Sequence, residues 1–318
     1  MTTTRGKVAI VGVGSVGAAT AFALRSSGVG SELVLVDIDE EKAEGERMDL
    51  DHGAYFTPPM RITTGDYEDC WDADVVVVTA GPNQKPGETR LDLAERNVGV
   101  FEELIPELTE GLADDSVLLV VTNPVDVLSY VSWAVSDLPK ERVIGSGTVL
   151  DTSRFRHVLS RECDVDPKNV HGYVVGEHGD SEVMLWSSTN VAGVPFETYM
   201  EAHRGGVSEA EKTEFEEEVR GAAYEIIERK GVTNYAIALA TREIVETILR
   251  DENSVLTVST LLEGEYGVDD VYTSTPCVVN RDGVRTVLEH DLSAEERAEF
   301  ERSAAVLQRN LEEVGYRD

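Results

Sequence analysis

The feature that most constrains the fold is a regular alternation of short apolar segments with segments of helical periodicity in the first half of the chain. The segment at residues 75–79 begins with four valines, so it has no polar face to turn toward water. Such a strand is typical of a parallel sheet that helices cover on both faces. The alternation therefore predicts an α/β fold with a doubly wound parallel sheet. The expected strands are residues 7–11, 33–36, 60–64, 75–79, 117–121 and 143–144, with expected helices ending near residue 27 and covering 40–55 and 90–110.

The pattern changes after about residue 147. An Asn-Arg-Asp-Gly turn at residues 280–283 lies between valines and predicts a hairpin. Capping boxes predict long helices after Ser208 and Ser293, because a glutamate (Glu211 and Glu296) follows each serine at the third position. We therefore expect one domain at residues 1–147 and a second, mixed α/β domain at residues 148–318, with a shared interface. The last helix should bury one apolar face, made of Phe300, Ala304, Leu307, Leu311 and Val314.

The composition is strongly acidic, with 61 Asp and Glu against 28 Lys and Arg and a net charge of −33. This charge argues against nucleic acid as a partner. Hydrophobic residues make up 41% of the chain and are well patterned, which argues against disorder. We interpret the acidity as an adaptation to a salt-rich cytoplasm, where salt screens the repulsion between surface carboxylates. The alternative is an ordinary acidic bacterial enzyme.

The three cysteines, Cys70, Cys163 and Cys277, are scattered and show no metal-ligand spacing and no disulfide framework. They fit a reducing cytoplasm, and we expect no metal site. The N-terminal segment does not have the pattern of a secretory signal, and no stretch has the length and apolarity of a membrane span.

A glycine fingerprint follows the first expected strand and predicts a dinucleotide site. Gly12 permits the tight turn, Gly14 lets a pyrophosphate approach the backbone, and Gly17 packs the helix against the sheet. Asp37 ends the next strand, 20 residues after the third glycine, where a carboxylate can accept hydrogen bonds from a ribose diol. Because Asp37 would repel a 2′-phosphate, the pattern favours NAD over NADP and makes residues 1–147 the NAD-binding domain. The alternative is a glycine turn with a surface aspartate.

Two further segments combine a histidine, a carboxylate and a guanidinium. His178 lies between glycines in the segment 176–180, and Asp151 and Arg154 lie three residues apart. A histidine held by an aspartate, beside an arginine that grips a carboxylate, can move a proton on a small 2-oxo or 2-hydroxy acid. Alone, His178 would more often be structural. The histidines at positions 52, 157, 203 and 290 carry no motif, and we interpret them as structural or surface residues.

Together these motifs resemble the lactate and malate dehydrogenase family over essentially the whole chain, in particular its bacterial-type L-lactate dehydrogenase branch. The resemblance implies a Rossmann NAD-binding domain followed by a catalytic domain that binds the substrate. The motifs that carry it are residues 12–17, 80–90 (Ala-Gly-Pro-Asn-Gln-Lys-Pro-Gly-Glu-Thr-Arg), 122–126 (Thr-Asn-Pro-Val-Asp), 150–154 (Leu-Asp-Thr-Ser-Arg) and 176–180 (Gly-Glu-His-Gly-Asp).

The resemblance also implies roles for matching residues. His178 would be the acid–base residue, Asp151 its partner, Arg154 the carboxylate-binding residue, and Arg90 a cation that polarises the carbonyl from a mobile loop. Asn123 would contact both substrate and cofactor, and its bond to Pro124 is expected to be cis. Thr233 would lie on the substrate wall. Further cofactor positions implied by the resemblance are Val16, Lys42, Tyr67, Gly81 and Ser146.

Gln84 distinguishes the two substrates of the family. The position six residues before Arg90 faces the variable group of the substrate, and the resemblance implies Gln in lactate enzymes and Arg in malate enzymes. A neutral glutamine tolerates the methyl of pyruvate, whereas the second carboxylate of oxaloacetate would lack a cation, at a cost of several kcal/mol. We therefore expect L-lactate and pyruvate as substrates, with malate as the alternative. Lys85 does not favour malate, because lactate enzymes also carry Lys there, and Pro82 replaces the usual small residue.

Other classes of protein fit the sequence less well. A family-4-type glycosidase uses a similar fold and NAD, but it needs a metal held by Cys and His, a pairing that Cys163 and Cys277 do not offer. A structural NAD-binding protein would not need His178, Asp151 and Arg154 together.

The resemblance further implies a homotetramer and a regulatory anion site between subunits. Arg156 and His171 match positions at which allosteric members of the family bind fructose 1,6-bisphosphate. Arg154 and Arg156 lie about 200° apart on a helix, so one can face the substrate while the other faces a neighbouring subunit. The alternative is that both residues are ordinary interface residues.

Overall fold

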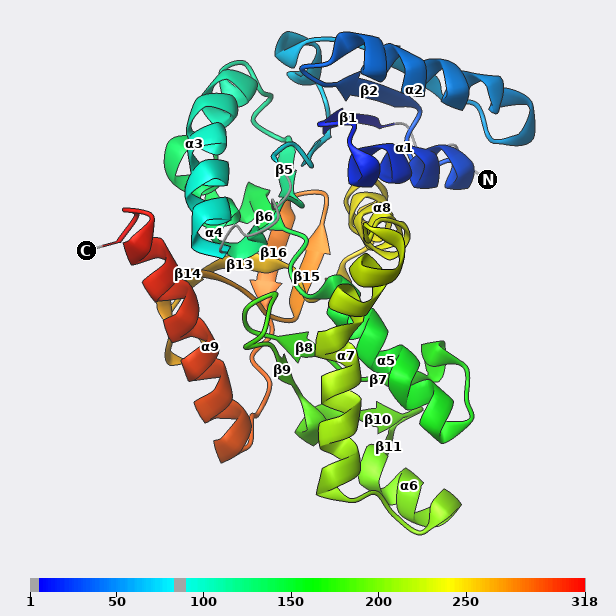
Figure 1. Cartoon of the computed structure of the whole chain (residues 1–318), viewed down its shortest axis with the longest axis vertical. Helices are drawn as coiled ribbons and strands as arrows, with labels where there is room; N and C mark the ends of the chain where they lie inside the picture. Colours follow the sequence, from blue (N-terminus) through cyan, green and yellow to red (C-terminus); the bar gives the residue numbers. More distant parts are fainter. Residues whose placement is uncertain (1–5, 83–89, 318) are drawn as a thin grey trace.

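The computed structural model describes residues 6–82 and 90–317, with the backbone only for residues 90 and 91. In the first half of the chain, strands and helices alternate as expected (Figure 1). The elements are β1 (Lys7–Val11), α1 (Ser15–Ser27), β2 (Glu32–Val36), α2 (Glu40–His52), β3 (Arg61–Thr64), β4 (Val75–Val78), α3 (Arg90–Thr109), β5 (Val117–Val120), α4 (Val125–Val135) and β6 (Val143–Gly145). The first six strands lie in the order β3-β2-β1-β4-β5-β6, all parallel, which confirms the doubly wound sheet.

Several boundaries differ by one residue from the expected ones, and the end of α2 differs by three. The helix expected at residues 40–55 is α2, which ends at His52 because Gly53 follows, and a short 3-10 turn covers Ala54–Phe56. The strand expected at 60–64 begins one residue later, at Arg61. The predicted cis bond between Asn123 and Pro124 is present.

The second half is mixed α/β, as expected, with helices that are longer than the strands. The predicted hairpin is formed by β15 and β16, and both predicted capping boxes begin helices, at α7 and α9. The elements are α5 (Val149–Cys163), β7 (Val170–His171), β8 (Val174–Val175), β9 (Val183–Met184), β10 (Asn190–Val191), β11 (Val194–Pro195), α6 (Phe196–Arg204), α7 (Glu209–Lys230), α8 (Tyr235–Arg250), β12 (Ser254–Leu256), β13 (Ser259–Glu263), β14 (Asp269–Ser274), β15 (Cys277–Asn280), β16 (Gly283–Val287) and α9 (Ala294–Glu313).

The central sheet does not end at residues 143–144, as the sequence suggested. Strands β13 and β14 from the second half extend it beyond β6, and Ser259 of β13 pairs with Gly145 in an antiparallel sense. Both strands are largely buried, so extending the sheet covers their apolar side chains. The two halves of the chain therefore share one sheet as well as an interface.

Helices cover both faces of this sheet, which explains why its central strands have no polar face. On one face α3 and α4 pack against the strands, and α9 joins them through Phe300, Ala304, Leu307 and Leu311. On the other face α1 and α8 pack together, with Leu24 and Ile248 buried. The C-terminal helix thus comes back onto the first half of the chain, where it helps to wall the cavity described below (Figure 1).

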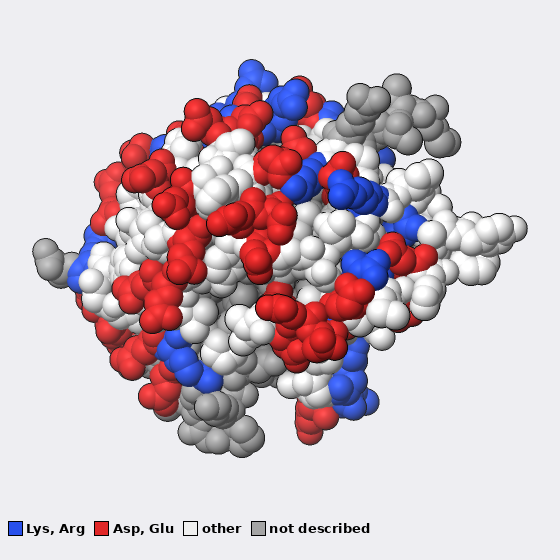
Figure 2. Space-filling model, turned by 90° about the horizontal axis from the view of Figure 1, so that it is seen from above, with Lys and Arg blue, Asp and Glu red and all other residues white. Residues whose placement is uncertain are grey.

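The surface shows how the acidic composition is distributed. In Figure 2 acidic side chains spread over much of the visible face, with smaller groups of Lys and Arg between them. Several cations each contact two carboxylates, which partly offsets the shortage of Lys and Arg. These cations are Arg47 (Glu44 and Asp51), Arg161 (Glu162 and Glu218), Arg204 (Glu162 and Glu211), Lys212 (Glu197 and Glu209), Arg242 (Glu243 and Glu246) and Arg250 (Glu246 and Glu252). Within residues 6–82 and 90–317, none of the helices has the length and apolarity needed to cross a membrane.

Candidate active site

Three side chains from two elements meet at the centre of the site. Nδ1 of His178 lies 2.6 Å from Oδ2 of Asp151, and Nη1 of Arg154 donates a hydrogen bond of 2.8 Å to Oδ1 of the same carboxylate. Asp151 and Arg154 lie three residues apart on α5, and therefore share one face of that helix. Since a carboxylate only accepts hydrogen bonds, Nδ1 of His178 carries a hydrogen, and Nε2 is left for proton exchange.

The loop that carries His178 is fixed by two features. Gly176 has φ +88°, and a Cβ there would lie 2.5 Å from Oγ of Ser303 on α9, so the position requires glycine. The backbone N–H of His178 donates a hydrogen bond of 2.8 Å to Asp126 on α4, and this buried carboxylate also accepts one of 2.6 Å from Ser259. Asp126 thus orients the peptide of His178, while Asp151 orients its ring.

The electrostatics of the pair favour a protonated histidine. Burial alone would lower the pKa of His178, but the charge of Asp151, the hydrogen bond to it and the charges of Asp126 and Glu182 raise this pKa to about 9. Burial alone would raise the pKa of Asp151, but His178 and Arg154 hold it below its usual value. At neutral pH His178 is therefore an imidazolium beside a carboxylate, ready to give a proton to a substrate oxygen.

These side chains open into a cavity of about 680 Å³. Its lining residues come from α3, α4, α5, α7 and α9, from Asn123 and Pro124 before α4, and from the loop between β8 and β9. Of the site residues expected from the sequence, four line the cavity (Asp151, Arg154, His178 and Asn123), whereas Thr233 and Ser146 are not among its lining residues. Its apolar wall is formed by Leu93, Ala94, Val127, Val219, Ala223, Ile227 and Val306.

Sequence reasoning missed three charged residues of this cavity, namely Glu182, Arg220 and the exposed Glu313. Glu182 is 4% exposed and lies four residues after His178. Arg220 lies on α7, one residue after the cavity residue Val219, and Nη2 donates a hydrogen bond of 3.0 Å to the backbone carbonyl of Glu182. Glu182 could have been predicted as a cavity residue because it is close in sequence to the histidine motif. Arg220 could not, because nothing in the sequence places α7 against this loop.

The glycine loop meets the requirements of a dinucleotide site. A Cβ at Gly14 would meet no atom within 4 Å, so a ligand can approach the backbone there, whereas a Cβ at Gly17 would lie 2.0 Å from the carbonyl oxygen of Gly12. No side chain caps the N-terminus of α1, which leaves its first N–H groups for phosphate. Asp37 accepts a hydrogen bond of 2.7 Å from the backbone of Val13, so its carboxylate lies at the glycine turn.

The remaining predicted cofactor residues are distributed around the ends of the parallel strands. Gly81 has φ +141° and follows β4, Ser146 is buried after β6, and Val16 is half-buried on α1. Tyr67 is half-buried and Lys42 is exposed on α2. Gln84 and Lys85 lie outside the described residues. Arg90 begins α3, and its side chain also lies outside the description.

The two residues of the predicted regulatory site lie near each other, away from the cavity. Nε of Arg156 donates a hydrogen bond of 3.0 Å to the carbonyl of Gly172, the residue after His171. The guanidinium lies 5.3 Å from the ring centre of Tyr173, and burial lowers its pKa. His171 is exposed at the end of β7. Arg156 does not line the cavity, in agreement with the opposite directions expected for Arg154 and Arg156.

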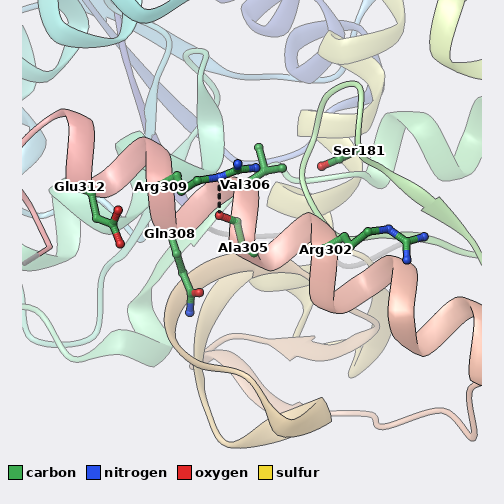
Figure 3. Close-up of a pocket in the computed structure, with 7 residues that line it drawn as sticks. All are labelled: Ser181, Arg302, Ala305, Val306, Gln308, Arg309 and Glu312. Carbon is green, nitrogen blue, oxygen red and sulfur yellow. Dashed lines mark hydrogen bonds between the residues drawn. The ribbon is translucent and has the colours of Figure 1, made fainter.

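A second hollow, of about 600 Å³, adjoins the cavity and is lined by Ser181 and by residues of α9. Figure 3 shows Ser181, from the loop after His178, facing a row of side chains on this helix. Ser181 and Val306 line both the hollow and the cavity. Arg309 is turned along its own helix, with Nε 3.3 Å from the carbonyl oxygen of Ala305. We assign no chemistry to this hollow.

Comparison with known families gives two matches that cover nearly the whole chain. The model described as the lactate/malate dehydrogenase NAD binding domain matches residues 6–145. The model described as the lactate/malate dehydrogenase alpha/beta C-terminal domain matches residues 148–316.

Individual relatives are similar over the same length. An L-lactate dehydrogenase 1 of Clostridium acetobutylicum is 49% identical over 308 residues, which are 97% of this chain and 98% of the relative. An L-lactate dehydrogenase of Thermoanaerobacterium saccharolyticum is 52% identical over 95% of this chain and 96% of its own length. The crystal structure of a lactate dehydrogenase enzyme from a Medee basin deep-sea metagenome library superposes with a TM-score of 0.95 at 44% identity, covering 98% of this chain and 99% of that chain.

Proposed function

Because this chain belongs to the lactate/malate dehydrogenase family, we propose that it is an NAD-dependent L-lactate dehydrogenase that interconverts pyruvate and L-lactate. The observation that carries the proposal is the contact of one buried carboxylate, Asp151, with both His178 and Arg154. NADH supplies the hydride when it is bound. The residues of the chain bind the substrate, orient it and exchange the proton.

In pyruvate reduction His178 gives the proton at Nε2 to the carbonyl oxygen as this oxygen becomes an alkoxide. Asp151 stabilises the imidazolium beforehand and holds the ring in one orientation. In lactate oxidation the neutral ring takes the hydroxyl proton, and the imidazolium that forms is stabilised by the same carboxylate. Arg90, at the start of α3, is assigned to polarise the carbonyl.

Arg154 is assigned to the carboxylate of the substrate. One of its guanidinium nitrogens is held by Asp151, and the rest of the fork can make two parallel hydrogen bonds to a carboxylate in the cavity. Its side chain is 14% exposed, so the ion pair forms largely out of water and is stronger than one at the surface. This grip fixes the reacting carbon relative to His178. Asn123 and Thr233 are assigned to further substrate contacts.

The choice of pyruvate over oxaloacetate is tested by Gln84. We expect a higher kcat/KM for pyruvate than for oxaloacetate in molar KCl, because a neutral side chain does not pair with a second carboxylate. Gln84→Arg should invert this preference by supplying a cation that interacts only with the dicarboxylate. Equal kcat/KM values for the two acids in the unchanged protein would contradict the lactate assignment and favour malate. Gln84→Leu, which is uncharged, is the control and should not favour oxaloacetate.

We also propose an assembly and a setting for the enzyme, in line with its family. It acts in the cytoplasm, with an NAD-binding domain at residues 1–147 and a catalytic domain at 148–318. The expected assembly is a homotetramer, and sedimentation of a monomer at high salt would contradict it.

Arg156 and His171 are proposed to bind fructose 1,6-bisphosphate between subunits. Supporting this, Arg156 is held against the backbone next to His171 and away from the cavity. Millimolar fructose 1,6-bisphosphate should then lower the KM for pyruvate, with a smaller effect as KCl rises, because salt screens a multiply charged anion. Arg156→Gln should abolish the effect. An unchanged KM at every salt concentration would show that these residues are ordinary interface residues.

A further inference from the structure

The cavity contains a buried carboxyl group that the proposed reaction does not use. Glu182 is 4% exposed, at the end of a tight turn in which its backbone N–H donates to the carbonyl of Gly179. Among the described residues, none donates a hydrogen bond to Oε1 of Glu182, although this atom is inaccessible to solvent. A buried carboxylate oxygen without a hydrogen-bond partner is costly when it carries charge, and protonation removes most of that cost.

The charged groups around Glu182 come from three elements. Its own loop supplies His178, α5 supplies Asp151 and Arg154, and α7 supplies Arg220. Two nitrogens of the Arg220 guanidinium are engaged: Nη1 donates to Glu216 at 3.1 Å and Nη2 to the backbone carbonyl of Glu182, while Nε is buried and has no hydrogen-bond partner among the described residues. Neither of these two hydrogen bonds reaches the carboxyl group of Glu182.

Further acids lie in the same region and add to the negative charge. Asp126 approaches from α4 and holds the backbone of His178. Glu177 is hydrogen-bonded to Ser181, and Asp180 to Tyr224 on α7. On α9, Glu313 lines the cavity but is exposed.

The charge of the central group decides what can bind. Arg154 and a protonated His178 carry one positive charge each and Asp151 one negative charge, so the group has one net positive charge. This matches the single negative charge of a 2-oxo monocarboxylate. An ionised Glu182 would bring the group to neutrality and offer Arg154 a competing carboxylate. The negative charge of the substrate would then have no compensating charge in a region of low dielectric.

We propose that Glu182 is a proton-linked positioning residue, which must be protonated for the substrate carboxylate to bind Arg154. The inference rests on the proposed function, because it takes Arg154 as the residue that binds the substrate. Glu182 acts through Arg154 and His178 and does not itself exchange a proton with the substrate.

The surroundings of Glu182 place its titration in a useful range. Burial and the charge of Asp151 raise the pKa of Glu182 to about 8, against the opposing charges of His178, Arg220 and Arg154. As pH rises, Glu182 therefore loses its proton before His178, whose pKa is about 9. Both protons must be present for pyruvate to bind and react. At alkaline pH the free enzyme has lost both of them, so both must be taken up when the substrate binds.

The experiment measures the protons taken up when a substrate analogue binds. Oxamate, which is isosteric with pyruvate but does not accept hydride, is titrated calorimetrically into the enzyme saturated with NADH, in buffers of different ionisation enthalpy. Between about pH 7 and about pH 10, uptake by the unchanged protein should rise toward two protons per site. In Glu182→Gln, whose side chain is neutral and of similar size, uptake should approach one proton per site. Glu313→Gln is the matched control, because it removes an exposed charge from the same cavity. Uptake by this variant should still approach two protons per site.

A kinetic measurement gives an independent test. Above about pH 9 the kcat/KM for pyruvate should fall about a hundredfold per pH unit in the unchanged protein and about tenfold in Glu182→Gln. An uptake that stops at one proton in the unchanged protein, with normal oxamate binding, would overturn this inference alone. Failure of oxamate to bind at any pH would overturn the proposed function and the inference with it.

Discussion

Replacing His178 with asparagine should lower kcat for pyruvate reduction by a factor of about 10² to 10⁴, the range that general acid–base catalysis contributes. The amide can occupy the place of the ring and donate a hydrogen bond to Asp151, but it has no proton to give at the position of Nε2. Because the NAD site is built from other elements, binding of NADH should be unchanged. Stopped-flow kinetics measure the first effect, and quenching of protein fluorescence by NADH measures the second.

Two variants show whether this effect belongs to the His178–Asp151 pair. His203→Asn changes an exposed histidine on α6 and should leave kcat near its original value. Asp151→Asn removes the carboxylate that keeps His178 protonated, so kcat/KM should fall and its alkaline limb should move to lower pH. If His178→Asn kept more than about a tenth of the original kcat, the imidazole would not be the acid, and the reading of the site in terms of general acid catalysis would be wrong.

The parts of the site that the sequence predicted are those in which a local pattern determines the geometry. Gly12, Gly14 and Gly17 are required by a turn and by close approach of backbone, and these demands are the same wherever the motif occurs. Asp151 and Arg154 share a helix face because of their spacing. The pairing of Asp151 with His178 followed from the family resemblance, because 27 residues separate them.

The parts that the sequence did not predict depend on contacts between distant segments. Asp126 belongs to a recognised motif, but it accepts its hydrogen bonds from His178 and Ser259. These two residues lie 52 and 133 positions away along the chain, so no local pattern could indicate them. Strands β13 and β14 join the first sheet because β6 leaves an edge that they cover, and no periodicity in residues 259–274 indicates which edge a strand will choose. Glu182 and Arg220 are brought together only when α7 packs beside the loop of His178.

Lowering KCl from molar to tens of millimolar should unfold the protein, or at least abolish activity before the helices are lost. The reason is the net charge of −33, which ion pairs cannot neutralise even where one cation serves two acids. At molar salt the Debye length is about 3 Å, and at about 0.01 M it is about 30 Å, so repulsion then acts across the whole molecule. Circular dichroism and activity after long dialysis measure the two effects. An unchanged spectrum and full activity at low salt would contradict our interpretation of the acidic surface.

The walls of the cavity are where repulsion should act first. Burial, the charge of Glu216 on α7 and that of Glu295 on α9 together raise the pKa of Glu299, although Arg302 lies 3.7 Å away. The negative charges of Glu299 on α9 and Glu216 on α7 therefore repel each other, and we expect salt to weaken this repulsion. Glu299→Gln should accordingly shift the KCl midpoint for loss of activity to lower concentrations. Glu225→Gln is the matched control: it breaks an existing pair with Arg229, so its midpoint should stay the same or rise. Equal midpoints for Glu299→Gln and the unchanged protein would place the salt-sensitive repulsion elsewhere on the surface, because Glu299 would then contribute nothing measurable to the separation of α7 from α9.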